Sequence, residues 1–278
     1  MTNTEPGPSA RADRTLDDWD TGSATQFFEY YEEKSNDPGT VQRFTAIRDT
    51  VLRCIGARNS PGKLDVLDVG CGAGTQSRMW SELGHRYVGV DINEPLIQLA
   101  RQRAVQLGMP AQFEVGTATE LPFADSCFDV SVLPELLEHV ADWKGCLNEA
   151  ARVLRPGGVM YVSTSNKLCP LQQEFNLPLY SWYPRSAQRY FERRASSDWP
   201  QLVNYAKYPA VHWFSYYALR DYLEPRGFAC SDRFDLVDVE HKGRGARTVL
   251  SVIRSFPPLR LLGQIATPYT VIVATKAG

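Results

Sequence analysis

The stretch VLDVGCGAG, residues 66 to 74, joins a short apolar run to three glycines at alternate positions. The run predicts a buried strand followed by a tight turn, because glycine adopts backbone angles that other residues avoid and lets a ligand lie against the main chain. Asp68 comes just before Gly70, Gly72 and Gly74. We therefore expect a ligand site at the carboxyl end of this strand.

The sequence after this turn alternates two kinds of pattern. Strand-like runs are KLDVLDV, RYVGVD and AQFEVG, and the stretches between them, TQSRMWSEL and EPLIQLARQRAVQL, have the spacing of amphipathic helices. Asn93 is the expected N-cap of the second helix, with Pro95 in its first turn and Gly108 at its end. Such alternation, continued by FDVSVL and GVMYVST, predicts a parallel sheet covered by helices.

Two aspartates indicate the kind of ligand. A dinucleotide-binding turn would have its third glycine one position later, where this sequence has Thr75. Asp68 would repel a pyrophosphate but would attract the cationic amino group of a methionine moiety. Asp91 ends the second expected strand, where an acidic residue can bind the hydroxyls of a ribose. The pattern predicts an adenosine joined to an amino acid, without phosphates.

The sequence resembles the class I S-adenosylmethionine-dependent methyltransferases over about residues 64–164, in the motifs VLDVGCGAG, VGVDIN, ELPFADSCFDV and EAARVLRPGGVMYVST. The resemblance implies an α/β fold with a doubly wound, seven-stranded, mostly parallel sheet of the Rossmann-like methyltransferase type. It implies S-adenosyl-L-methionine as cofactor, with the three glycines under its methionine portion. Asp91 would hold the ribose and Ile92 would lie on the adenine.

The adenine contact departs from the family pattern. In the family, the stretch that reads TATELP here commonly begins with an acidic residue that binds the adenine amino group. This sequence has Thr117 at that place, so Thr117, the Ala118 N–H or Thr119 are the expected substitutes, and an ordinary polar loop is the alternative. Leu133, at the end of the fourth expected strand, is predicted to lie near the methyl-bearing sulfur.

PELLEHV, residues 134–140, follows that strand, which places Pro134 in the first turn of an expected helix at the ligand-binding edge of the sheet. Helical spacing would gather Glu135, Glu138 and His139 on one face. The three residues could hold a divalent cation such as Mg²⁺ or Zn²⁺. Alternatively His139, with Glu135, is catalytic and removes a proton from the acceptor. The third interpretation is a first turn whose acidic residues only stabilise the helix.

The Glu-x-x-Glu-His element, the strand end STSNK and the histidine ahead of a helix in VHWFSYYALRDYL are similar to those of O-methyltransferases of ubiquinone biosynthesis. This resemblance implies methyl transfer to a hydroxyl of an aromatic, quinone-precursor or glycosylated natural product. His212 and His241 are secondary candidates for the base. Two alternatives stay open: N- or C-methylation of a small metabolite, and a methyltransferase-fold protein that binds without catalysis.

We expect the chain to be organised in five segments. These are a disordered tail (1–20), N-terminal helices over the cofactor site (21–60), the S-adenosylmethionine-binding core (61–165), an inserted aromatic-rich substrate lid (166–217) and a C-terminal completion of the sheet (218–278). The aromatic residues of the lid would line a substrate pocket or form a small core of their own.

Composition limits the partners and the location. The formal net charge of -2 and the pI near 6.1 give no general attraction for nucleic acid, so a small-molecule acceptor is expected. Six scattered cysteines without a CxxC pair, and the lack of an apolar leader in the first twenty residues, predict a cytoplasmic protein with reduced thiols. The sequence does not indicate an oligomeric state.

One stretch, residues 242–262, mixes basic and apolar residues and suggests a further partner. Its basic residues are Lys242, Arg244, Arg247, Arg254 and Arg260. The stretch is either a peripheral contact with an anionic membrane surface or a helix packed on the sheet with its basic face in water.

Overall fold

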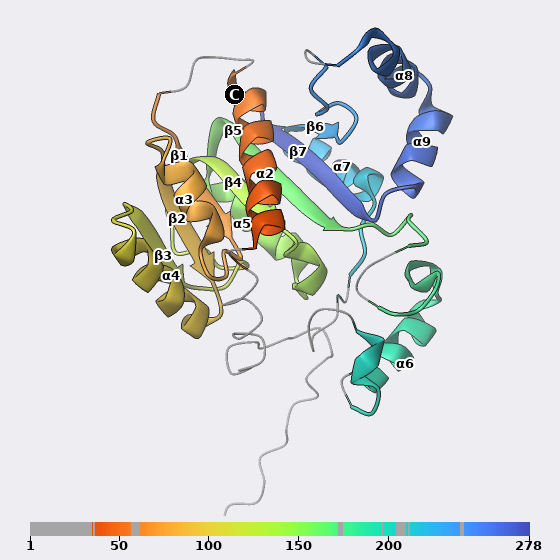
Figure 1. Ribbon diagram of the computed structural model, residues 1–278, viewed down its shortest axis with the longest axis horizontal. Helices are drawn as coiled ribbons and strands as arrows, with labels where there is room; N and C mark the ends of the chain where they lie inside the picture. Colours follow the sequence, from red (N-terminus) through yellow and green to blue (C-terminus); the bar gives the residue numbers. More distant parts are fainter. Residues whose placement is uncertain are drawn as a thin grey trace, which may run out of the picture.

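The computed structural model describes residues 35, 37–56, 62–171, 175–195, 197–203, 210, 212–239 and 242–278. This part of the chain contains a seven-stranded sheet in the order β3-β2-β1-β4-β5-β7-β6 (Figure 1). The strands are β1 (Asp65–Val69), β2 (Arg86–Asp91), β3 (Ala111–Val115), β4 (Phe128–Pro134), β5 (Leu154–Ser165), β6 (Phe228–Asp232) and β7 (Tyr269–Lys276). Strands β1 to β5 run parallel, and β7 is antiparallel to β5 and β6. The predicted fold class is confirmed.

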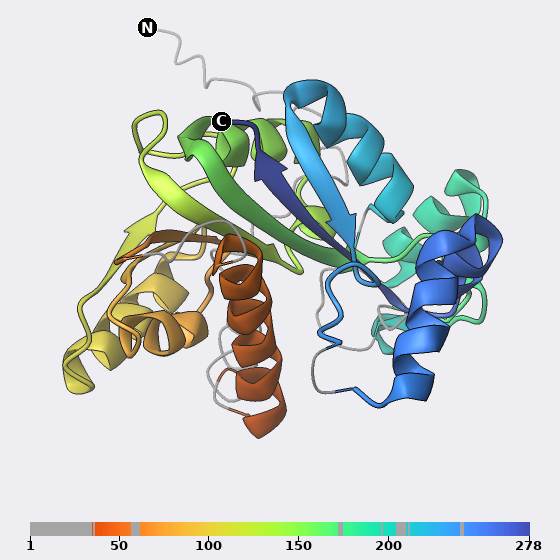
Figure 2. The same ribbon diagram turned by 90° about the horizontal axis from the view of Figure 1, so that it is seen from above.

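Helices cover both faces of the sheet (Figure 2). One face carries α2 (Pro38–Gly56), α3 (Thr75–Ser81) and α4 (Glu94–Gln106), and the other carries α5 (Trp143–Val153) and α7 (Tyr216–Leu223). Strand β1 shows how the two cores form. Val66 packs with the α2–α4 side, while Leu67 and Val69 pack with the α5–α7 side, as expected from the alternation of side chains along a strand.

Local signals set the bounds of α4. Asn93 caps the helix, since its side chain accepts a hydrogen bond from the backbone N–H of Leu96 at 3.1 Å. Leu96, Ile97, Ala100 and Ala104 form the buried stripe. This helix and its cap are as predicted.

Strand β6 is only five residues long. It ends at Asp232, whose side chain accepts hydrogen bonds from the backbone N–H groups of Phe234 and Asp235. These local bonds turn the chain out of the sheet. The chain then forms α8 (Arg244–Ser255) and α9 (Pro257–Ile265) before β7.

The aromatic segment 166–217 is described in part. It contains α6 (Arg185–Ala195) and the short 3₁₀ turns Tyr180–Trp182 and Pro200–Leu202. Phe175 and Tyr180 form a separate small core, with ring centroids 4.0 Å apart. Residues 1–34, which include the predicted tail, lie outside the described part of the chain. No described helix is long and apolar enough to cross a bilayer.

Candidate active site

The glycine turn has the conformation that its sequence predicts. Gly70, Gly72 and Gly74 have φ values of +74°, +52° and +73°, in the left-handed region that favours glycine. The turn also has close neighbours. A Cβ at position 74 would lie 2.6 Å from the ring of Phe113, and one at position 70 would lie 2.9 Å from the side chain of Leu136. Backbone conformation therefore favours glycine at both positions, and packing against the Phe113 ring also requires it at position 74.

Asp68 lies under this turn, buried on the α3 side of the sheet. Its Oδ2 accepts hydrogen bonds from Tyr87 Oη at 2.6 Å and Gln76 Nε2 at 2.9 Å. Its Oδ1 is also buried and has no hydrogen-bond partner among the described residues. Burial, opposed by the two hydrogen bonds, raises the pKa of Asp68 to about 7. A buried carboxylate oxygen without a partner fits the amino group of a methionine moiety.

Asp91 is the last residue of β2, and its carboxylate stabilises the glycine turn by accepting a backbone hydrogen bond. Its Oδ2 accepts from the Gly72 N–H and its Oδ1 from the Asn93 N–H, both at 2.8 Å. Burial raises the pKa of this carboxyl as well. Ile92, the residue next to it, is 52% exposed and offers an apolar surface, as required for stacking on a base. The predicted ribose and adenine contacts remain predictions that this arrangement suits.

The other residues predicted to contact the cofactor are less exposed than Ile92. The Thr117 and Thr119 hydroxyls are 2.9 Å apart and bond to each other, and Ala118 packs partly against the core. Leu133 is fully buried in the α5–α7 core. Any contact of Leu133 with a cofactor would therefore have to come from its backbone.

The predicted helix over PELLEHV is wrong, because β4 continues to Pro134, which pairs with Ser163 of β5. The chain then turns sharply at Glu135, whose φ is +54°. A single 3₁₀ turn, Leu137–His139, follows. The two carboxylates and the imidazole therefore do not share one helical face.

The three polar side chains have separate surroundings. Glu135 forms an ion pair with Arg43 of α2, whereas Glu138 is buried and accepts a hydrogen bond from the Thr164 hydroxyl at 2.7 Å. In the described residues, no group of three or more His, Cys, Asp or Glu side chains could hold a metal ion. The structure thus gives no support to a divalent cation bound by this trio.

His139 is half-buried, and desolvation lowers the pKa of its imidazole to about 4. The ring is therefore neutral at neutral pH. Its backbone N–H donates to the Leu136 carbonyl, and Leu136 lies against Gly70, so the residue is close to the glycine turn. The backbone N–H of His212 donates to the Glu138 carbonyl at 3.1 Å, which places this secondary candidate beside the same segment. His241 lies outside the described residues.

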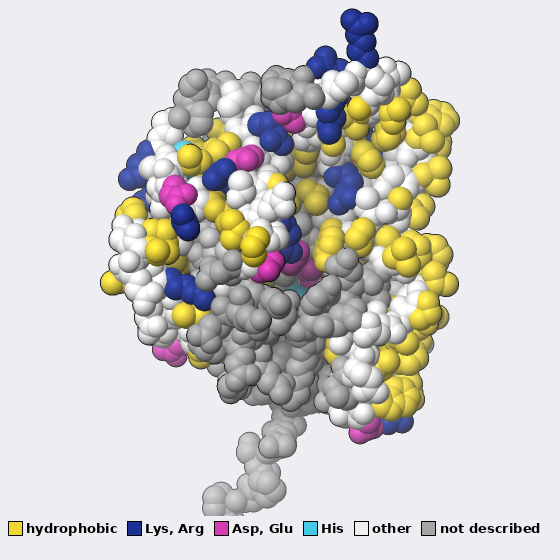
Figure 3. Space-filling view, in the orientation of Figure 1, with side chains coloured by type: hydrophobic (Ala, Val, Ile, Leu, Met, Phe, Trp, Pro, Cys, Tyr) yellow, Lys and Arg dark blue, Asp and Glu magenta, His cyan; other side chains and the backbone are white. Residues whose placement is uncertain are grey.

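The space-filling view shows acidic and histidine side chains in a hollow at the centre of one face (Figure 3). Residues that the sequence did not single out support the groups around this edge. Tyr87 and Gln76 hold Asp68, Arg43 pairs with Glu135, and Thr164 bonds to Glu138. Gln76, Tyr87 and Thr164 lie in stretches that were used to predict helices and strands, but no local signal indicated these contacts, which arise from the fold.

The structure thus combines a doubly wound sheet, a left-handed glycine turn and a buried aspartate under that turn, which is the arrangement expected for a cationic, adenosine-containing ligand. Residues 67–162 match the sequence family described as "Methyltransferase domain". Over these residues the chain is similar to that family, as the resemblance predicted.

Relatives with curated names match the same region. The chain is 37% identical over 130 residues to "Ubiquinone biosynthesis O-methyltransferase" of Rhizobium rhizogenes, covering 46% of this chain and 52% of the relative. It is 34% identical over 155 residues to the protein of the same name from Rhizobium etli, covering 53% and 62%. The matches thus span about half to three fifths of these relatives.

A solved structure extends the likeness in fold. The S-adenosylmethionine-dependent methyltransferase from Mesorhizobium loti superposes with a TM-score of 0.52 at 20% identity, covering 82% of this chain and 98% of that one. At this identity the likeness concerns the fold alone.

Proposed function

We propose that the chain transfers a methyl group from S-adenosylmethionine to a hydroxyl of a small aromatic acceptor, such as a quinone precursor or a glycosylated natural product. The observation that carries this proposal is His139, a neutral imidazole at the edge formed by the glycine turn and the end of β4. Methylation of a hydroxyl needs a group that removes its proton, and a neutral histidine can do so.

When bound, the cofactor supplies an activated methyl group on a positively charged sulfonium, and this charge is lost on transfer. The chain's own residues would bind and orient the reactants. Asp68 would face the cofactor's ammonium group, Asp91 the ribose and Ile92 the adenine. His139 would accept the hydroxyl proton. Its low pKa keeps it unprotonated before the reaction, so that the lone pair on the ring nitrogen is available.

The relatives support the choice of a hydroxyl. Both are named for O-methylation in ubiquinone biosynthesis, and both match about half of this chain. Because the matched region covers only part of those proteins, the acceptor is a proposal for this chain.

The test is turnover by the full chain with S-adenosylmethionine and a catechol acid, measured as release of S-adenosylhomocysteine. We expect His139→Ala to lower turnover by about a hundredfold or more, while calorimetry shows unchanged binding of S-adenosylhomocysteine. Glu82→Gln, at an exposed position at the end of α3, is the control that should retain turnover.

Three results would overturn parts of the proposal. Wild-type turnover in His139→Ala would exclude this residue as the base. Methylation of an aromatic amine in place of the catechol would exclude the hydroxyl. Tight cofactor binding without turnover on phenols, amines or carbon acids would favour a protein that binds without catalysis.

A further inference from the structure

The α8–α9 pair leaves a set of apolar side chains in solvent. The pair does not cover a face of the sheet, as one interpretation of the sequence expected, but stands at one end of it (Figures 1 and 2). In α8 only Leu250 is buried, and in α9 only Gln264. The exposed apolar side chains are Val249 (60%), Val252 (48%), Phe256 (53%), Leu259 (38%), Leu261 (40%) and Leu262 (59%).

Helix geometry gathers some of these side chains along one line. Val249, Val252 and Phe256 are spaced by three and four residues, and successive residues of an α-helix are about 100° apart. The Phe256 N–H still donates to the Val252 carbonyl at 2.9 Å, so the spacing holds at the helix end. Val249, Val252 and Phe256 therefore form an apolar strip on the exposed surface of α8.

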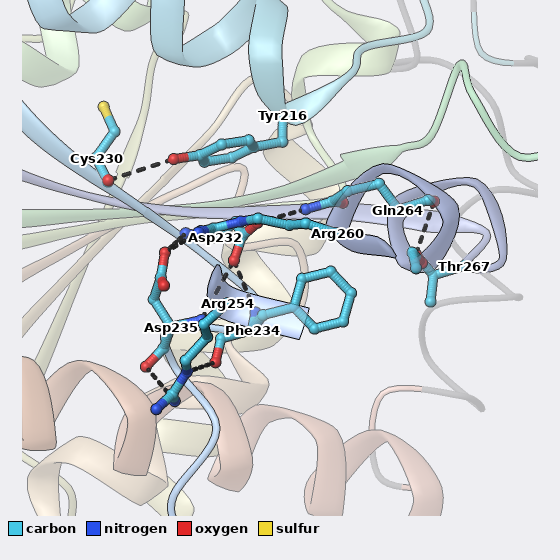
Figure 4. A network of polar contacts seen from close by, with 10 residues as sticks. Tyr216, Cys230, Asp232, Phe234, Asp235, Arg254, Arg260, Gln264 and Thr267 are labelled. Atoms are coloured by element: carbon cyan, nitrogen blue, oxygen red, sulfur yellow. Dashed lines mark hydrogen bonds and ion pairs between the residues drawn. The ribbon is translucent and has the colours of Figure 1, made fainter. Parts of the chain in front are cut away.

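The pair is firmly attached to the rest of the protein (Figure 4). Arg260 Nε donates to Asp232 Oδ2 at 2.7 Å, and Gln264 Nε2 donates to the same oxygen at 2.7 Å. Arg254 donates to the backbone carbonyls of Phe234, Asp235 and Val237. Two of the five basic residues noted in the sequence are thus used to hold the helices in place. The apolar strip is fixed in position and does not need to fold before it meets a partner.

The remaining basic residues give this end of the molecule its charge. Lys242, Arg244 and Arg247 are exposed at the start of α8. No Asp or Glu occurs between residues 241 and 278. An exposed apolar strip beside exposed basic side chains matches the interface of an anionic bilayer, where apolar side chains enter the acyl boundary and basic ones meet the headgroups.

A second segment adds amphipathic rings at the same end. Trp182, Tyr190 and Trp199, in and around α6, are 55%, 49% and 38% exposed. The guanidinium of Arg194 lies over the rings of Tyr190 and Trp199, at 5.6 and 5.0 Å from their centroids. Both ribbon views place α6 at the end that carries α8 and α9, and hydrophobic side chains follow that edge in the space-filling view (Figures 1, 2 and 3). Tryptophan and tyrosine are the residues that favour the bilayer interface.

We propose that the end of the molecule formed by α8 and α9 binds the surface of an anionic lipid bilayer, with the apolar strip in the interface and Lys242, Arg244 and Arg247 at the headgroups. This proposal does not depend on the methyl acceptor. It would place the protein where an acceptor with a lipid tail is found.

The test is co-sedimentation of the full chain with vesicles of phosphatidylcholine alone and of phosphatidylcholine with phosphatidylglycerol. We expect binding to the anionic vesicles and a loss of binding at high salt, since salt screens the headgroup attraction. Arg244→Glu should weaken binding at least about fivefold, and Phe256→Ser should weaken it by a similar factor. Lys63→Glu and Val105→Ser, at exposed positions elsewhere, are the matched controls and should bind like the wild type.

Other occupants of this surface would give different results. No sedimentation with anionic vesicles would overturn the proposal. Equal binding by Phe256→Ser and the wild type would show that α8 is not the contact. Light scattering that shows a dimer, which Phe256→Ser dissociates, would assign the surface to a second copy of the chain and contradict the bilayer. Circular dichroism of each variant separates lost binding from lost folding.

Discussion

Replacing Asp68 with asparagine should stabilise the cofactor-free protein at alkaline pH. The ordinary pKa of aspartate, 3.8, is raised to about 7 here because the carboxyl is buried. Between these values the folded protein holds a proton that the unfolded chain has lost, so the free energy of unfolding falls as the pH rises through this window. From about pH 5 to pH 8 the loss amounts to about 3 kcal/mol. Asparagine carries no charge and therefore lacks this loss.

The stability curves of the two proteins should cross. In the Asp68→Asn variant the side-chain carbonyl oxygen can still accept from Tyr87 and Gln76, but the buried amide hydrogens need partners, which costs about 1–3 kcal/mol at every pH. The wild type should then be the more stable protein near pH 5, and the variant should equal or exceed it near pH 8. Urea denaturation at both pH values measures the difference. Glu114→Gln, at an exposed position, is the control that should leave the pH dependence unchanged.

The same variant tests the binding role. If Asp68 faces the cofactor's ammonium group, the substitution removes a hydrogen bond between charged groups, which contributes about 1.5–3 kcal/mol, or roughly a tenfold to hundredfold change in affinity. Calorimetric titration with S-adenosylhomocysteine, which keeps the amino group, measures it. Parallel stability curves for the two proteins would refute the titration argument, and an unchanged affinity would refute the contact.

Three further predictions follow from the same structure. Gly74→Ala should lower the free energy of unfolding in urea by several kcal/mol, because the added Cβ would lie 2.6 Å from the Phe113 ring. Gly84→Ala is the control: its φ is +80° and no atom lies within 4 Å of the added Cβ, so it should show only the backbone cost of about 1 kcal/mol. Since the pKa of His139 is lowered to about 4, it should not produce an acid limb in kcat/KM above about pH 6, and a limb near pH 6.5 that disappears in His139→Gln would contradict the burial. Binding of S-adenosylhomocysteine near pH 7 should release about half a proton from Asp68, measured by calorimetry in buffers of different ionisation enthalpy, and no dependence on buffer would exclude this linkage.

The parts of the fold that the sequence predicts well depend on local chemistry. The glycine turn follows from the left-handed angles that only glycine adopts easily, and α4 follows from its Asn93 cap and its apolar spacing. The alternation of patterns predicts a parallel sheet but does not show which strands are neighbours, so the order of the strands comes from the structure.

The segment after β4 shows why part of the site was not predictable. Pro134 at the start of an acidic stretch predicts a helix, but Pro134 pairs with Ser163, and the Glu135 N–H donates to the Ser163 carbonyl at 2.8 Å. The strand is extended by its neighbour, and no local signal shows how far β5 reaches. The ion pair of Glu135 joins it to Arg43, 92 positions away, which only the placement of α2 explains.

Burial has opposite effects on the pKa values of the two main titratable groups of the site, and both effects favour the uncharged form of the group. Burial raises the pKa of Asp68 to about 7, so the carboxyl is partly protonated at neutral pH. It gains its full negative charge only when a cationic ligand displaces the proton. Burial lowers the pKa of His139, so that no imidazolium is present to repel that ligand. In a site with the opposite pattern, an ionised histidine would attract anions. A permanently charged aspartate would be paired with a counterion from the protein. In the proposed site, Asp68 would therefore lose the rest of its proton as the cofactor's ammonium group binds, while His139 would stay uncharged.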